Sequence, residues 1–281
     1  MLGACELVGL ILLIAYLART WPRVRGTTLT HVRGWAICAV AAIAAATLFP
    51  SDARKFAAWS LTFCPALSLL GAKRPQHIAW NFVVLSLWGV LILPVLESAL
   101  LRPGAPIDLG ELRPWFLLGL ILLTTVSYFA TRYAAAGVLL AVSQALFFAR
   151  YLPFASLGPN LSFLKLGAVA VLFLAVVVAE LRFHRRHADE LHPLDVLWLD
   201  FRDSFGLFWS LRVAERVNAA CESGKRPEHL EWEGFVVPPD HALGSALDAA
   251  LAGGLRTTLR GLLRRFVDHA WLRTRRVDDG A

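Results

Sequence analysis

The sequence predicts an all-α integral membrane protein, with a bundle of about seven transmembrane helices followed by a mostly helical cytoplasmic tail. Hydrophobic residues make up 57% of the 281 residues and charged residues 17%, whereas soluble domains average about 45–50% and 25%. Long apolar runs, such as 80–101 and 161–180, suffice to cross a hydrocarbon core of about 30 Å as helices. Short stretches that contain arginine separate these runs.

Seven apolar segments fill residues 1–183, and each is expected to be helical because a helix satisfies its own backbone hydrogen bonds in lipid. The third segment is short and contains Pro65, so an interfacial or re-entrant helix is the alternative there. Small residues at 39–46 allow the second segment to approach its neighbours closely. The expected spans are 3–18, 35–50, 56–72, 79–101, 115–131, 134–150 and 162–181.

The distribution of basic residues predicts the orientation. With seven spans and an outer N-terminus, ten Lys and Arg flank the spans on the inner side and six on the outer side, whereas six spans leave eight on each side. The positive-inside rule therefore favours seven spans in an inner (plasma) membrane, with the N-terminus outside and the C-terminus cytoplasmic.

The net charge of +7 comes from the part of the chain that contains the predicted spans. Residues 1–181 carry 13 Lys and Arg against 6 Asp and Glu, whereas residues 182–281 carry 15 of each. The basic excess therefore surrounds the spans, where it suits a lipid bilayer, and it gives no support for nucleic-acid binding.

Polar side chains in or beside the spans are the candidate functional residues, because such groups are costly in lipid. Glu97 falls near an outer end and Glu180 near an inner end, and we expect both to be interfacial or paired with arginine. Gln144, with Thr124 and Ser127, is expected to hydrogen-bond between helices, and a solute path is the alternative.

Histidines follow the last span. Glu180, His184 and His187 share one helical face, which a metal ion could use. No second histidine cluster completes a ligand set, so we expect a solvated helix here and predict neither metal nor cofactor. The four cysteines are scattered, and the common hydrolase, metalloprotease and nucleotide-binding motifs do not occur, so no catalytic residue is assigned.

The predicted cytoplasmic tail covers residues 184–281, and a protein partner is expected to contact it through residues 195–281. Residues 195–220 predict a helix, either on the membrane surface or docked on the tail's own core. Gly224 is expected to end it, and 229–237 alternate as a strand. After a break at 253–254, a basic amphipathic helix is predicted, whose apolar residues are Leu255, Leu259, Leu262 and Phe266.

Two segments, 64–76 with Trp80 and Asn81, and 198–206, resemble uncharacterised multi-pass membrane proteins of planctomycete-type bacteria. The resemblance implies a bacterial inner-membrane protein and assigns neither an activity nor a functional residue.

Three functional hypotheses remain. The leading one is a non-enzymatic subunit or scaffold, motivated by the scarcity of charge inside the spans and by the amphipathic tail. The alternative is a small-solute transporter or channel component, with a path near Thr124, Ser127 and Gln144. The third is a membrane-embedded enzyme that acts on lipid through Glu97 or His187.

Overall fold

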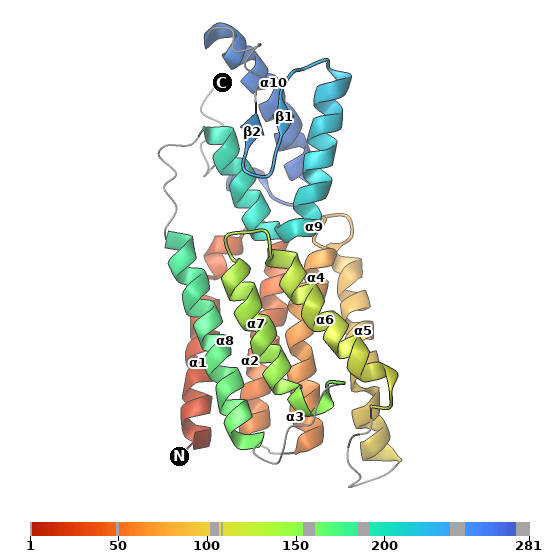
Figure 1. Ribbon diagram of the computed structural model, residues 1–281. Coiled ribbons are helices and arrows are strands. Elements are labelled where there is room, and N and C mark those ends of the chain that lie inside the picture. The colour runs from red at the N-terminus through yellow and green to blue at the C-terminus, as the bar shows by residue number, and fades with distance from the viewer. Residues whose placement is uncertain are drawn as a thin grey trace.

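In a computed structural model, a bundle of helices carries a smaller helical cap at one end (Figure 1). The structure describes residues 2–48, 51–101, 107, 109–153, 161–184, 192–236 and 245–273. We call the elements from α1 to α8 the bundle, and residues 192–236 with 245–273 the cap. The described part is mostly helical, as the sequence predicts.

The bundle is built from helices that pack mainly against their neighbours in sequence. The helix α7 lies along α8, α1 along α2, and α6 along α7, while α2 also packs on α4. Its elements are α1 (Leu2–Arg19), η1 (Trp21–Val24), α2 (Leu29–Leu48), α3 (Asp52–Ser60), η2 (Leu61–Phe63), α4 (Cys64–Leu70), α5 (His77–Leu100), α6 (Leu112–Tyr128), α7 (Ala134–Phe147), η3 (Ala149–Tyr151) and α8 (Leu161–His184).

Three helices of the described part are long and apolar enough to cross a membrane, namely 29–48, 77–100 and 164–183. Two further apolar helices, α6 and α7, are shorter, with 17 and 14 residues. The expectation of seven full-length spans therefore goes beyond what these lengths support, although a helix lies at the place of every expected span.

The expected third span, 56–72, is not one helix. It is divided into α3, a tight turn of 3₁₀ helix at η2, and α4. Pro65 has no N–H to donate to the carbonyl group four residues earlier, so the regular α-helical pattern cannot run through this point. The N–H of Cys64 donates instead to the carbonyl oxygen of Leu61, which closes the tighter turn.

The cap consists of α9 (Pro193–Ser223), a hairpin of β1 (His229–Leu230) and β2 (Phe235–Val236), α10 (Ser245–Leu263) and α11 (His269–Arg273). The two strands are antiparallel, so the single strand expected at 229–237 is wrong. The helix α9 ends before Gly224, as predicted. The break expected at 253–254 is also wrong, because α10 continues through both glycines.

Two hydrophobic cores occupy the described residues. The first lies inside the bundle and is rich in aromatic side chains, among which Phe63 and Phe148 stack with ring centroids 5.2 Å apart. The second lies inside the cap, where Phe201 and Phe205 stack at 4.6 Å. Leu29 and Leu69 of the bundle belong to this second core, so the cap packs onto the bundle rather than extending from it.

The docked alternative for residues 195–220 is the one observed, and the basic helix packs into the cap as well. Leu197 is fully buried, and α10 turns Leu255, Leu259 and Leu263 into the cap core. Phe208 and Leu211 of α9 stay exposed, because the kink of α9 turns them out of this core.

Candidate functional site

The most highly organised polar cluster of the described residues lies at the junction of bundle and cap, where two arginines surround Asp203. The Nε and Nη2 atoms of Arg202 each donate to Oδ1 of Asp203 at 3.1 Å. The backbone N–H of Arg132 donates to the same oxygen at 3.3 Å, and the Arg132 Nε lies 3.2 Å from Oδ2. Arg132 belongs to the turn between α6 and α7, so this carboxylate joins cap to bundle.

The cluster is withdrawn from water. The side chains of Arg202 and Asp203 are 8% and 3% exposed. Arg202 also donates from Nη1 to the carbonyl oxygen of Trp232 at 2.8 Å and lies 3.4 Å from the exposed carboxylate of Glu233. Buried charges are tolerated when they are paired and hydrogen-bonded in this way.

A kink in α9 lets the cap approach the bundle. Gly206 has φ +74° and ψ −175°, a conformation that is essentially restricted to glycine. A Cβ atom added there would lie 2.4 Å from the carbonyl oxygen of Ser127 in α6. The backbone of the cap therefore touches the backbone of the bundle, and only glycine fits between them.

Two tryptophans fix this contact by donating to backbone carbonyl groups of the bundle. The Nε1 atom of Trp209 donates to the oxygen of Leu69 at 2.8 Å, and that of Trp232 donates to the oxygen of Ala130 at 2.7 Å. The acceptors lie in the last turn of α4 and just beyond the end of α6, so the two tryptophans hold the cap against the ends of two bundle helices.

The segment between α10 and α11 adds backbone pairing. The N–H of Thr28 donates to Phe266, and the N–H of Asp268 donates to Gly26, at 3.0 and 2.7 Å, which forms a short antiparallel bridge. The N–H of Arg74 donates to the carbonyl oxygen of Arg265 at 2.7 Å. Cap and bundle are thus joined through both backbone and side chains.

Glu180 is paired with arginine, as expected. Both of its oxygens accept from Arg23, at 2.7 and 2.8 Å, and the hydroxyl of Tyr16 donates to it as well. These hydrogen bonds raise the pKa of Arg23 above its ordinary value. The group links α1, η1 and α8 at the end of the bundle that carries the cap (Figure 1).

Gln144 makes the interhelical hydrogen bond that the sequence suggested. Its Nε2 donates to the carbonyl oxygen of Thr62 at 3.1 Å, at the η2 turn, while its Oε1 is buried without a partner. Thr124 and Ser127 donate to carbonyl groups of their own helix. The structure therefore does not join these three side chains through hydrogen bonds.

The other candidate residues lie apart from the junction. Glu97 is exposed and lies 3.6 Å from Arg113. His184 is the last residue of α8, and its side chain and the whole of His187 lie outside the described residues. Among the residues that the structure describes, no three His, Cys, Asp or Glu side chains form a group that could hold a metal ion.

Sequence reasoning did not identify the Asp203 cluster. The sequence does not bring Arg202 and Asp203 together with their partner, because Arg132 is 71 residues away from Asp203. One signal was available, since a glycine beside neighbouring opposite charges in the middle of a long helix indicates a special contact.

Comparisons with protein-family models, with curated proteins and with solved structures find no match to this chain.

Proposed function

We propose that this chain is a non-enzymatic, multi-pass protein of a bacterial inner membrane, and that its cap is a fixed platform for a cytoplasmic protein partner. The observation that carries this proposal is the junction itself. The Asp203 cluster, the Gly206 contact and the backbone pairing at residues 26–28 hold the cap in one orientation. A surface held in this way can bind a partner without first losing the conformational entropy of a flexible tail.

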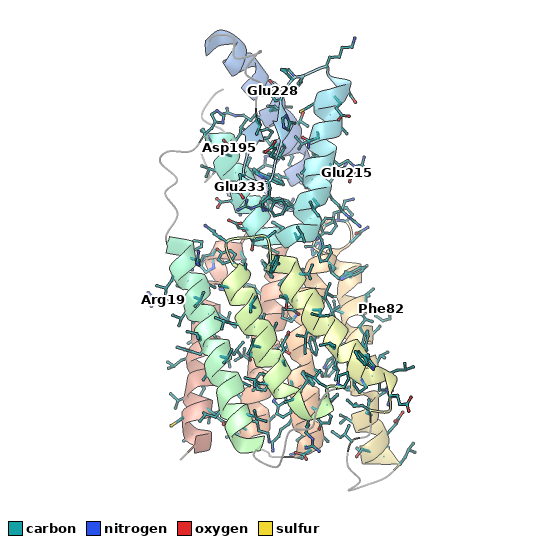
Figure 2. The ribbon with its side chains drawn as sticks, viewed as in Figure 1. Arg19, Phe82, Asp195, Glu215, Glu228 and Glu233 are labelled. Atoms are coloured by element: carbon teal, nitrogen blue, oxygen red, sulfur yellow. The ribbon has the colours of Figure 1, made fainter. Side chains whose placement is uncertain are left out.

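The membrane placement is supported by the outer surface of the bundle. Helix α5 exposes a stripe of large apolar side chains, including Ile78, Phe82 and Leu100, which are 73%, 73% and 76% exposed. Phe82 points away from the bundle in Figure 2. An apolar surface of this extent is unfavourable in water and favourable in lipid.

The orientation rests on the arrangement of the ends. The N-terminus lies at the end of the bundle opposite the cap (Figure 1). This agrees with an odd number of crossings, and the positive-inside rule then favours an outer N-terminus and a cytoplasmic cap. The helices α3, α6 and α7 are each short for a full crossing. We propose that the third crossing is the broken helix from α3 to α4, and that the other helices of the bundle surround it.

The partner surface that we propose is the outer face of α9. Beyond the kink it exposes Arg212, Glu215, Arg216 and Glu222, side chains of both signs that point away from the cap core. Mixed charges of this kind favour a protein surface of complementary charge and select against wrong partners. Glu215 lies on this face in Figure 2.

Purification of the full chain at native expression level in a mild detergent tests the proposal, with mass spectrometry of the proteins that accompany it. We expect a stoichiometric partner that is lost in Glu215→Arg and kept in Glu97→Arg, a matched charge reversal at the opposite end of the bundle. A chain that purifies without a stoichiometric protein partner would contradict the platform proposal.

One observation favours the transporter alternative, namely the unpartnered Oε1 of Gln144 in the interior of the bundle. Solute flux into proteoliposomes that disappears in Gln144→Leu would support it. The same flux in Gln144→Leu and in the wild-type chain would remove Gln144 from any solute path.

A further inference from the structure

At the end of the bundle opposite the cap, three basic side chains gather around one carboxylate. Lys165 of α8 interacts with Lys55 of α3 and lies near Asp52 and Arg150. The Nη1 atom of Arg150 is 3.0 Å from Oδ2 of Asp52, so these two charges neutralise each other. Among the described residues, neither lysine has a carboxylate partner within ion-pair distance. One carboxylate thus faces three basic groups among the described residues, so the cluster keeps an excess of positive charge.

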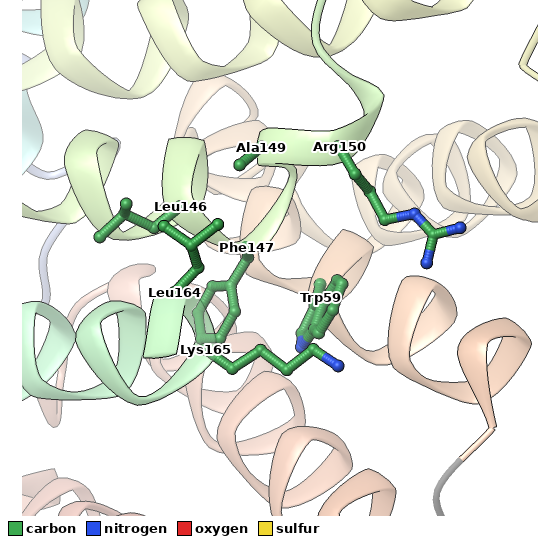
Figure 3. A pocket seen from close by; sticks show the side chains of 7 residues that line it. All are labelled: Trp59, Leu146, Phe147, Ala149, Arg150, Leu164 and Lys165. Atoms are coloured by element: carbon green, nitrogen blue, oxygen red, sulfur yellow. The ribbon is translucent and has the colours of Figure 1, made fainter. Parts of the chain in front are cut away.

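Beside these charges the surface is hollowed (Figure 3). Leu146, Phe147 and Leu164 form an apolar wall, and Trp59 lies next to Phe147 with ring centroids 5.5 Å apart. The Lys165 ammonium lies 5.7 Å from the centre of the Trp59 ring. The hollow is small and partly open to solvent. It combines an apolar wall with a cationic rim.

Two like charges side by side repel each other, and a part-buried position strengthens the repulsion because less water screens it. A bound anion removes this cost, since one phosphate group accepts hydrogen bonds from both ammonium groups. The position of the cluster adds a second argument. With the cap in the cytoplasm these lysines lie on the outer side, where the positive-inside rule gives no reason for them.

We propose that the hollow between α3, α7 and α8 binds the phosphate group of an anionic amphiphile. Lys55 and Lys165 contact the phosphate oxygens, and the first carbons of the attached chain lie against Leu146, Phe147 and Leu164. The same cationic rim accepts free inorganic phosphate if the apolar wall contributes nothing. The lipid source rests on the membrane placement proposed above, whereas binding of inorganic phosphate does not.

The test uses the full chain in detergent, with dihexanoyl phosphatidylglycerol or inorganic phosphate added, and native mass spectrometry or calorimetry as the measurement. We expect phosphatidylglycerol to bind, and Lys165→Gln and Lys55→Gln each to weaken it roughly tenfold, since a charge-assisted hydrogen bond is lost. Lys165→Arg should retain binding. Arg113→Gln, which removes one positive charge elsewhere in the bundle, should leave the affinity unchanged.

The two phosphate sources give different results. Equal affinity for the lipid and for inorganic phosphate would assign the site to free phosphate, whereas tighter lipid binding that weakens in Leu164→Ser would assign it to a membrane amphiphile. The proposal is overturned if neither ligand binds, or if both lysine variants bind as tightly as the wild-type chain. This readout does not depend on a protein partner of the cap, so it can fail or succeed independently of the platform proposal.

Discussion

Replacing Gly206 by alanine tests whether the kink of α9 is what allows the cap to dock. The new Cβ would lie 2.4 Å from the carbonyl oxygen of Ser127, about 0.9 Å inside the usual C···O approach of about 3.3 Å. The obstacle is backbone, so no rotation of a side chain can relieve it. The conformation of Gly206 adds a strain of about 1–3 kcal/mol for any other residue.

These contributions set the expected magnitude. Overpacking adds about 1–3 kcal/mol to the conformational strain, and the lower entropy of alanine in the unfolded chain returns about 0.4–1 kcal/mol. We therefore expect Gly206→Ala to lower the free energy of unfolding by about 1–6 kcal/mol, a large share of the 5–15 kcal/mol typical of a folded protein.

Denaturant unfolding of the purified chain in detergent, followed by tryptophan fluorescence, measures this change. Limited proteolysis should also cleave the cap of Gly206→Ala faster than that of the wild type, because an undocked cap exposes its backbone. The control is Gly261→Ala, since Gly261 is in α10 with nothing within 4 Å of the added Cβ. Alanine should stabilise that helix by about 0.5–1 kcal/mol. If Gly206→Ala is as stable as the wild type, the close contact with Ser127 does not exist.

Three further predictions concern ionisable groups. Asp203→Ala leaves the buried Arg202 and the part-buried Arg132 without their acceptor, so we expect a loss of about 3–5 kcal/mol in the free energy of unfolding. A loss below about 1 kcal/mol would contradict the buried cluster. Glu180→Gln breaks the part-exposed pair with Arg23, so the loss should stay below about 1 kcal/mol and shrink further at 1 M salt. Burial raises the pKa of the Cys221 thiol, so at pH 8–9 a water-soluble maleimide should modify it more slowly in the folded than in the denatured chain, and equal rates would place it in solvent. The unfolded Cys221 thiol loses its proton at a lower pH than the folded thiol. The free energy of unfolding therefore falls as the pH rises from about 9 through the higher pKa of the folded thiol.

The positions of the bundle helices in the sequence were predictable, because each helix coincides with a continuous apolar run. Such a run favours a helix whatever its neighbours in the folded protein are. The interruption near Pro65 was also visible, since a missing N–H is a local property. The course of α10 was not. Gly254 lies inside that helix, and a Cβ atom at this position would lie only 2.7 Å from the guanidinium of Arg226. The glycine serves close packing here, although in the sequence it looks like a helix break.

The candidate site was less predictable, because it depends on contacts between residues that are far apart in the sequence. Glu180 and Gln144 were identified because a polar residue in an apolar segment stands out in the sequence, and both have interhelical partners. The Asp203 cluster depends on the turn between α6 and α7 meeting the middle of α9, which is a property of tertiary packing. An arginine on a helix is ordinarily exposed to solvent, whereas the docked cap buries Arg202.

The pairing of residues 26–28 with 266–268 also affects the order in which the protein matures. A ribosome that adds about 5–20 residues per second needs tens of seconds to reach this second strand after it has made the first. During that interval the N–H of Thr28 and the carbonyl group of Gly26 lack their final partners, and the end of the bundle that carries the cap is uncovered. Closure of the cap is therefore a late event of biosynthesis, and chains that stop before Phe266 should expose this end to proteases.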